Sequence, residues 1–215
     1  MSRAIIFVNG PLADARQVRR LIQPGDTFIA ADGGTRHALA LGLKPSAVIG
    51  DLDSLDEETI KKLEKDGTRI MRFPADKNET DFELALKFAV EASFREILVV
   101  AALGGRLDQT LGNLALLTDP SLAGLDIRVE DGVEEAFFVR TRSRVEGSPG
   151  DIVSLIPWGG EAKGVSAQGL RWPLKGETLY PQKTRGISNE LLGETASLSL
   201  ESGLLLVVHT HHRKY

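Results

Sequence analysis

Short apolar runs in the first half of the chain alternate with segments that have the spacing of helices. The first run, residues 4–8, is closed by Asn9, Gly10 and Pro11, and a basic-faced helix is expected over about residues 14–22. This order of strand and then helix repeats five times, which favours a parallel sheet covered by helices on both faces. The five expected strands are residues 4–8, 27–31, 47–49, 69–73 and 97–102.

Two of the expected helices carry a capping-box spacing at their start. Ser54 is followed three residues later by Glu57, and Thr80 is followed three residues later by Glu83. In this pattern a hydroxyl oxygen accepts a hydrogen bond from the backbone near the helix start. We therefore expect helices to begin at Ser54 and at Thr80.

Acidic residues follow the ends of four of these strands. Asp32 follows the second strand, Asp51 and Asp53 follow the third, and Asp81 and Asp108 lie in loops after the fourth and fifth. Ligands bind at the carboxyl ends of parallel strands, so four loops bring acids to one sheet edge. Close carboxylates repel unless a positive charge lies between them, and Mg²⁺ takes oxygen ligands of this kind. The pattern predicts a metal-phosphate site. Asp51, Asp53 and Asp81 are the candidate ligands, although Asp81 also suits the first turn of a helix.

A glycine-rich loop, Gly104-Gly105-Arg106, follows the fifth strand and opens a helix. Glycines let backbone amides approach an anion, and a helix N-terminus favours negative charge. Arg106 suits bidentate binding of phosphate oxygens, and Asp108 suits a helix cap, a metal ligand or the orientation of a hydroxyl. The Gly-Lys-Ser/Thr ending of a Walker A loop is missing. A plain turn remains the alternative for this loop.

The second half of the chain has a different pattern. Short apolar runs are punctuated by glycine and proline, and residues 196–200 alternate as a half-buried strand does. This predicts an all-β module, a sandwich or a barrel. The expected organisation is an α/β domain over residues 1–131 followed by a β domain over residues 132–215.

Charge and composition limit the class of protein. The net charge of −4 argues against general binding of nucleic acid or membranes, and the absence of cysteine excludes disulfides and thiolate metal sites. Neither a signal-peptide pattern nor an apolar run of ~20 residues is present, so a cytoplasmic location is expected.

Histidine and tryptophan give weaker signals. His37 falls within an expected helix, while His209, His211 and His212 crowd the C-terminus, where a solvated tail is expected. Trp158 and Trp172 lie in the β module, where packing is the ordinary role of such rings. No Ser/His/Asp arrangement stands out in the sequence.

Five motifs in order resemble those of the thiamine pyrophosphokinase family. They are Ala31-Asp32-Gly33-Gly34, Gly50-Asp51-Leu52-Asp53-Ser54, Thr80-Asp81-Phe82-Glu83-Leu84-Ala85-Leu86, Gly104-Gly105-Arg106-Leu107-Asp108-Gln109 and Gly186-Ile187-Ser188-Asn189-Glu190. The resemblance implies a catalytic α/β domain, a thiamine-binding β-sandwich and a homodimer whose active site lies at the subunit interface. It implies transfer of a diphosphoryl group from ATP to the hydroxyl of thiamine, with Mg²⁺ as cofactor.

The resemblance also implies roles for single residues. Asp51, Asp81, Asp108 and Arg106 correspond to catalytic residues, and Asp51, Asp53 and Asp81 to the Mg²⁺ ligands. Nucleotide contacts fall to Thr80, Lys77, Arg106 and Gln109, and contacts near thiamine to Asp32, Ser188 and Asn189.

Two departures from the family pattern are visible. Asn78 stands where many relatives have an acid, which affects the expected nucleotide contacts of Lys77 and Asn78. An aromatic ring commonly stacks on the thiamine pyrimidine, but Leu191 and Leu192 follow the Ser188-Asn189 motif here. The sequence therefore leaves the stacking residue unassigned.

Three other functions fit parts of the pattern. A phosphatase of the haloacid-dehalogenase type would use Asp51 as its nucleophile, and a sugar-nucleotide transferase would use the Asp-x-Asp pair to hold Mn²⁺. A non-catalytic nucleotide sensor on this fold would bind ATP without turnover. For diphosphoryl transfer, Asp51 or Asp81 is expected to accept the hydroxyl proton.

Overall fold

The computed structural model describes residues 3–212, and the chain divides into two compact units. The first unit ends at Gly132 and the second begins at Val133, whereas the sequence pattern places the change after Asp131. Each unit has its own buried core.

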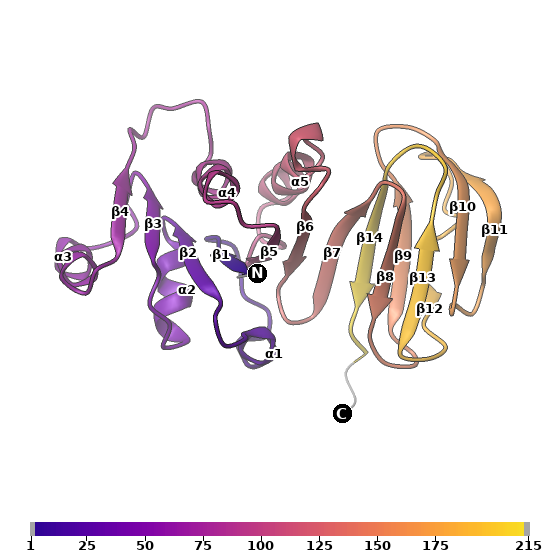
Figure 1. Ribbon diagram of the computed structural model, residues 1–215, viewed down its shortest axis with the longest axis horizontal. Coiled ribbons are helices and arrows are strands. Elements are labelled where there is room, and N and C mark those ends of the chain that lie inside the picture. The colour runs from indigo at the N-terminus through magenta and orange to yellow at the C-terminus, as the bar shows by residue number, and fades with distance from the viewer. Residues whose placement is uncertain (1–2, 213–215) are drawn as a thin grey trace. The chain divides into compact units, whose positions relative to one another are not determined.

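The first unit alternates strands and helices throughout (Figure 1). Its elements are β1 (Ala4–Phe7), α1 (Ala15–Leu21), β2 (Thr27–Ala31), α2 (Gly34–Ala40), β3 (Ala47–Gly50), α3 (Glu57–Lys65), β4 (Arg69–Arg72), α4 (Asp81–Glu91), β5 (Glu96–Val100), α5 (Leu107–Leu116), η1 (Pro120–Leu122) and β6 (Asp126–Glu130). The five expected strands are all present, and β6 adds a sixth that the sequence pattern did not single out.

The six strands form a parallel arrangement in the order β6-β5-β1-β2-β3-β4. Successive strands run outward from β1 to β4, and the chain then returns to place β5 on the other side of β1. The strand order therefore reverses between β1 and β5, which is where open α/β sheets bind ligands. β1 and β3 are buried at every residue, as expected for strands covered on both faces.

Helices cover both faces of this sheet. Helix α4 packs on β1, β2 and β3, and helix α2 packs on β1 and β2. Figure 1 shows α4 and α5 on one side of the strands and α1 and α2 on the other. The expected α/β architecture is confirmed.

The two expected capping boxes have different outcomes. Thr80 caps α4, because its hydroxyl accepts the Glu83 N–H at 3.1 Å. The prediction for Ser54 is wrong: α3 begins at Glu57, and Asp56 caps it by accepting the Thr59 N–H at 2.8 Å. Ser54 instead donates its hydroxyl to Asp53, so its side chain makes a hydrogen bond within the loop and does not cap a helix.

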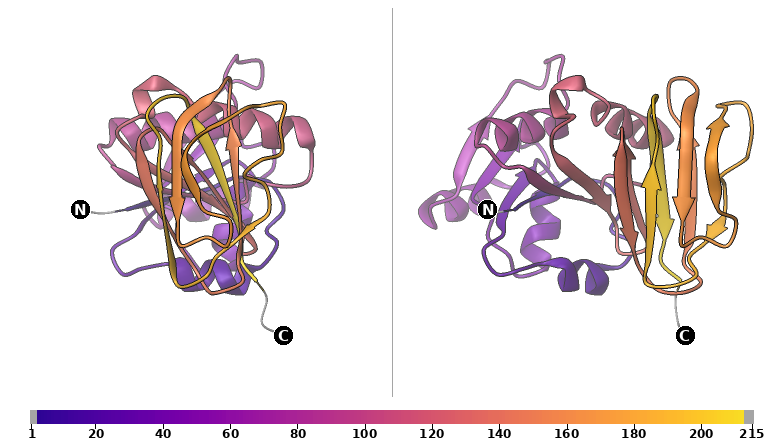
Figure 2. Two further views of the ribbon diagram at one scale, coloured as in Figure 1. Left: turned by 90° about the vertical axis from the view of Figure 1, so that its right-hand side faces the viewer. Right: turned by 45° about the vertical axis from the view of Figure 1, so that its right-hand side comes forward.

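The second unit consists of strands only within its described part. These are β7 (Glu134–Val139), β8 (Arg142–Glu146), β9 (Ile152–Pro157), β10 (Ala162–Gln168), β11 (Leu174–Leu179), β12 (Asn189–Glu190), β13 (Thr195–Ser199) and β14 (Leu205–Thr210). They pair as β12-β9-β14-β7 and as β11-β10-β13-β8, and Figures 1 and 2 show them as the salmon to yellow arrows.

The core of this unit draws apolar side chains from both sets of strands. Phe137, Leu155 and Val207 come from one set, and Val165 and Leu198 come from the other. Two antiparallel sheets that bury their inner faces against each other form a β-sandwich. The sandwich is confirmed, and the barrel is not found.

Among the described residues, none of the helices has the length and apolar character that crossing a membrane requires.

Two glycines in helices of the first unit provide a matched test of close packing. A Cβ added at Gly34 would lie 2.1 Å from the Phe7 carbonyl oxygen, which is backbone and cannot move aside. A Cβ at Gly112, inside α5, would meet nothing within 4 Å. We expect Gly34→Ala to lower the free energy of unfolding by about 1–3 kcal/mol. We expect Gly112→Ala to raise it by about 0.5–1 kcal/mol. Urea denaturation of both variants measures the difference, and equal effects would contradict the packing described.

Candidate active site

Three acids gather at the carboxyl ends of β2 and β3. One carboxylate oxygen from each of Asp32, Asp51 and Asp53 lies within 4.8 Å of the other two. Asp32 is 6% exposed, and its Oδ1 atom is buried without a hydrogen-bond partner. A buried carboxylate oxygen without a partner is costly, so it marks a place that a positive ligand would stabilise.

Asp81, at the first position of α4, lies beside this group and pairs with a cation. Its Oδ1 atom is 2.9 Å from the Lys77 Nζ atom. Burial raises the pKa of the Asp81 carboxyl, and the negative charges of Asp51 and Asp32 act in the same direction, while Lys77 opposes them. Burial lowers the pKa of Lys77, but the carboxylates of Asp81, Asp51 and Asp32 together outweigh it and leave that pKa raised.

Gly50 makes this close approach possible. Its φ angle is 152°, and a Cβ there would lie 2.9 Å from Asp32 Cβ and 3.0 Å from Asp81 Cγ. The missing side chain is therefore what lets Asp32, after β2, and Asp81, at the start of α4, flank the end of β3.

The backbone is strained where three of the strands end. Asp32 follows β2 with a φ of 41°, Leu52 follows β3 with 65°, and Ala101 follows β5 with 60°. Such conformations cost about 1–3 kcal/mol each in residues other than glycine and cluster at functional sites. Their positions coincide with the edge that carries the acids.

A hollow of about 330 Å³ lies where the strand order reverses. The segment after β1 and the glycine-rich loop after β5 line it, with Gly10, Gly104, Gly105 and Arg106 among its residues. Gly104 and Gly105 have φ angles of 74° and 68°, which glycine adopts without strain. The side chain of the N-cap residue Arg106 makes no hydrogen bond to the backbone of α5. A helix N-terminus attracts anions.

Arg106 and Asp108 are paired with each other at the rim of this hollow. Arg106 donates from Nε to Asp108 Oδ1 at 3.1 Å and from Nη2 to Oδ2 at 2.5 Å. The guanidinium lowers the pKa of the Asp108 carboxyl. Both side chains are mostly exposed, so Arg106 is able to exchange this partner for a phosphate at little cost.

A second hollow of about 310 Å³ adjoins the first on the side of the acids. Asp32, Lys77, Thr80 and Asp81 line it. Four residues line both hollows: Val8, Asn9, Gln109 and Asn113. A continuous depression therefore runs from the glycine-rich loop to the acids, as a polyphosphate with a bound cation requires.

Sequence reasoning missed Asn9 and Asn113 in this depression. Asn9 was taken only as part of a turn that closes the first strand. Its position directly after the central strand was the available signal, because that strand borders the point where the order reverses. Asn113 is buried and donates its amide to the Ala102 carbonyl at 3.0 Å, which fixes the loop after β5.

Ser188 and Asn189 lie in the second unit, where Asn189 and Trp172 together form what we call the Trp172 platform. Asn189 is 3% exposed, accepts the Trp172 N–H at 3.0 Å and donates to the Trp172 carbonyl at 2.7 Å. The Trp172 ring is 49% exposed, with the Arg171 guanidinium 5.0 Å from its centroid. Ser188 has a φ of 54° and donates its N–H to Ser154 Oγ. Asn189 therefore positions an exposed aromatic ring.

The first unit provides a donor set that fits a divalent cation. Carboxylate oxygens are the ligands that Mg²⁺ prefers, and it commonly uses one or two of them together with phosphate oxygens. Asp51 and Asp53 come from one turn, where the Asp53 N–H donates to Asp51 Oδ1 at 3.3 Å. Asp32, with its unpartnered oxygen, completes the group. The sequence pattern assigned this third place to Asp81.

Comparison with known proteins gives two family matches. The family model described as "Thiamin pyrophosphokinase, catalytic domain" matches residues 18–129. The model described as "Thiamin pyrophosphokinase, vitamin B1 binding domain" matches residues 139–205. The matched regions fall in the first and second units respectively.

Individual relatives agree with these matches. Thiamine pyrophosphokinase of Bacillus subtilis is 29% identical over 185 residues, which cover 85% of this chain and 86% of the relative. The crystal structure of that name from Bacillus subtilis superposes with a TM-score of 0.87 at 25% identity over 99% of this chain and 100% of the other. A thiamin pyrophosphokinase structure from Geobacillus thermodenitrificans gives a TM-score of 0.84 at 27% identity, with 100% of this chain and 99% of the other covered.

Metal binding tests the acid group directly. We expect Asp51→Asn to weaken Mn²⁺ binding by on the order of tenfold or more, because it removes one charged oxygen ligand. Asp56→Asn is the matched control: Asn caps helices as well as Asp does, and Asp56 lies outside the group. Electron paramagnetic resonance of free Mn²⁺ measures both affinities. Equal binding by the two variants would show that Asp51 is not a ligand.

Proposed function

The chain belongs to the thiamin pyrophosphokinase family, and from this premise we propose that it transfers the diphosphoryl group of ATP to the hydroxyl of thiamine. The products are thiamine diphosphate and AMP. The observation that carries the proposal is the depression in the first unit that joins the glycine-rich loop to a group of acids. The family resemblance found in the sequence motifs is confirmed by the two family matches.

The first unit is proposed to bind the phosphate donor, ATP. We propose that Asp51 and Asp53 hold Mg²⁺, with Asp32 and Asp81 beside them. When bound, this ion neutralises charge on the triphosphate. Lys77, Thr80 and Gln109 line the same depression and are proposed to contact the nucleotide. Asn78, where many relatives have an acid, is a neutral neighbour of Lys77 in this scheme.

The chain's own groups orient the transfer. Arg106 and the amides of the glycine-rich loop are placed to hold phosphate oxygens, which lowers the energy of the charged transition state. We propose that Asp108 holds Arg106 at the rim until a phosphate replaces it as the partner of the guanidinium. Asp81 is the better candidate to accept the hydroxyl proton of thiamine, because a raised pKa makes its carboxylate the stronger base.

The second unit is proposed to bind the acceptor, thiamine. We propose that Trp172 is the aromatic ring that stacks on the thiamine pyrimidine, since it is exposed and its backbone is held by Asn189. Ser188 and Asn189 then act near thiamine as the family motif implies, Asn189 through the position of Trp172. The sequence alone favours packing over stacking on a ligand for Trp172.

Two further parts of the proposal concern the assembly and its location. We propose a homodimer in which the acids of one subunit face the Trp172 platform of the other. Exposed Trp172, Ile187 and Leu192 in the second unit support an association surface.

The protein is proposed to be cytoplasmic, where ATP is available.

The family match favours this function over the three others that the sequence pattern allowed. A phosphatase would form a phosphoaspartate at Asp51, a sugar-nucleotide transferase would prefer a diphospho-sugar, and a sensor would bind ATP without turnover. From ATP, Mg²⁺ and thiamine, a phosphatase would release free phosphate, and the other two would yield neither AMP nor thiamine diphosphate.

Product analysis tests the proposed reaction. Incubation with ATP, Mg²⁺ and thiamine is expected to yield AMP and thiamine diphosphate in equal amounts, measured together by chromatography. Asp51→Asn is expected to lower the rate by about 100-fold or more, and the control Asp56→Asn to retain it. Thiamine monophosphate, or free phosphate alone, would contradict diphosphoryl transfer.

The shared active site has its own test, which uses a heterodimer of two inactive variants. Asp51→Asn disables the donor side and Trp172→Ala the acceptor side. If sites are shared, a heterodimer purified with two affinity tags holds one intact site and regains about half of wild-type activity. If each site lay within one chain, both sites would carry a lesion and the heterodimer would stay as inactive as its parents.

A further inference from the structure

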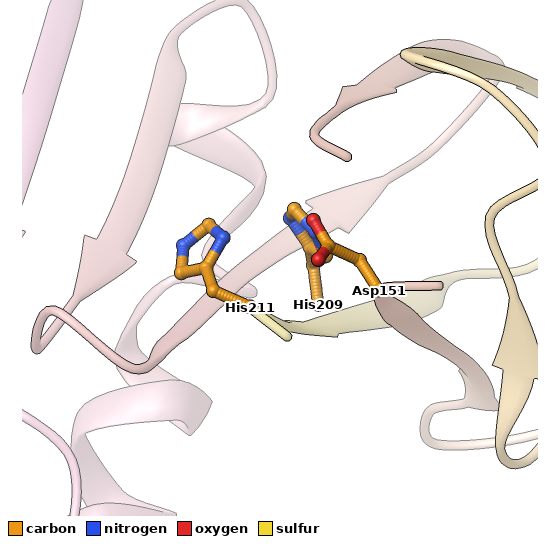
Figure 3. Close-up of side chains that lie close together, drawn as sticks. All are labelled: Asp151, His209 and His211. Carbon is orange, nitrogen blue, oxygen red and sulfur yellow. The ribbon is translucent and has the colours of Figure 1, made fainter. Parts of the chain in front are cut away.

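A second group of metal-ligating residues lies in the β-sandwich, at the end of β14 (Figure 3). One ring nitrogen from each of His209 and His211 and one oxygen of Asp151 lie within 4.8 Å of one another. Figure 3 shows the Asp151 carboxylate against the His209 ring, with the His211 ring beside them. The expectation of a solvated tail is wrong for His209, which is fully buried within β14.

Strand geometry explains why these residues meet. His209 and His211 are two positions apart, so an extended chain places both on one face. On neighbouring strands, His209 pairs with Glu135 of β7 and with Val153 of β9, and Asp151 directly precedes β9. A Cβ at Gly147 would lie 2.4 Å from Asp151 Oδ2 and 2.8 Å from His209 Nε2, so a glycine is required beside the pair.

Asp151 is held in a fixed orientation. Its Oδ2 atom accepts the Ser148 N–H at 2.8 Å and lies 2.8 Å from His209 Nε2, and its Oδ1 atom accepts the His212 N–H at 2.7 Å. Ligating carboxylates are commonly fixed by hydrogen bonds of this kind. The same bonds lower the pKa of Asp151 against the opposing effect of burial, which keeps it an anion.

His209 has a carboxylate on each side. Its Nδ1 atom is buried, makes no hydrogen bond and lies 3.5 Å from Glu135 Oε2. Histidines that bind metals through one nitrogen usually direct the other toward a carboxylate, which fixes the tautomer. The arrangement of Asp151, His209 and Glu135 has this form.

We propose that Asp151, His209 and His211 bind a divalent transition metal of the zinc type, with Glu135 orienting His209. Two imidazoles and one carboxylate suit Zn²⁺, Co²⁺ or Ni²⁺ and do not suit Mg²⁺, which selects oxygen ligands. Zn²⁺ with bonds of roughly 2.0–2.2 Å has ligand atoms about 3.3 Å apart. Asp151 Oδ2 and His209 Nε2, which lie 2.8 Å apart, would therefore open slightly around the ion. The ion fastens the end of β14 to the start of β9.

An ion pair without metal is the competing explanation. A protonated His209 between Asp151 and Glu135 accounts for the contacts at 2.8 and 3.5 Å. These two contacts do not involve His211, whose ring lies edge-on to that of His209 with centroids 4.4 Å apart and offers a nitrogen to the same group.

Zinc titration of the full chain tests the proposal. The protein is first stripped with a chelator and then titrated by calorimetry in excess Mg²⁺, which occupies the acid group of the first unit. We expect one Zn²⁺ per chain and binding that is at least about tenfold weaker in His211→Ala. His212→Ala is the matched control: its side chain is exposed and outside the group, and its backbone N–H to Asp151 remains. This variant is expected to bind as the wild type does.

Two further readouts separate a metal site from an ion pair. Zn²⁺ is expected to raise the melting temperature of the wild type and of His212→Ala but not of His211→Ala. Co²⁺ bound to the wild type is expected to give the visible absorption of a tetrahedral site, a result that needs no variant. Absence of saturable Zn²⁺ binding by the wild type, or equal binding by His211→Ala, would overturn the proposal in favour of the ion pair.

Discussion

Repulsion between carboxylates is the constraint on which the first unit depends. Asp32, Asp51 and Asp53 lie within 4.8 Å of one another, and Asp81 faces Asp32 across Gly50. Such a group is stable only when the surrounding structure holds it and a cation offsets part of its charge. Lys77 does this for Asp81. The strands β2 and β3 carry the loops that hold Asp32, Asp51 and Asp53, and the glycine-rich loop after β5 lies at the same edge of the sheet.

The sequence predicted the elements of this edge well, because strand-helix alternation and acids after strands are local patterns with a fixed spatial meaning. The limits of β2 agree residue for residue, and Thr80 caps α4 as its spacing predicts. Local patterns failed where two adjacent candidates compete: Asp56 and not Ser54 caps α3. They also failed where the burial of a residue depends on pairing with strands that are distant in the sequence. His209 sits in a polar stretch of sequence, yet pairing with β7 and β9 buries it.

Other functional candidates carried almost no local signal. Asn9 matters because strand order reverses beside it, which is a property of topology and not of neighbouring residues. Trp172 is 17 positions from Asn189 in sequence, and only the structure shows their reciprocal hydrogen bonds. Positive φ angles at Asp32, Leu52 and Ala101 are equally invisible in the sequence, since none of these residues is glycine. Strain at strand ends is a consequence of the assembled sheet.

The bonds between Asn189 and Trp172 also bear on how tightly a flat ligand can be held. An exposed aromatic on a mobile loop loses backbone freedom when a ligand orders it, at about 1–2 kcal/mol of conformational entropy per residue. Because the reciprocal bonds already order the Trp172 backbone in the folded protein, this entropy is lost on folding and not when a ligand binds. An indole fixed in this way has only two side-chain torsions left to restrict. Flat heteroaromatic molecules in general, and not one vitamin alone, would therefore meet a low entropic barrier at this ring.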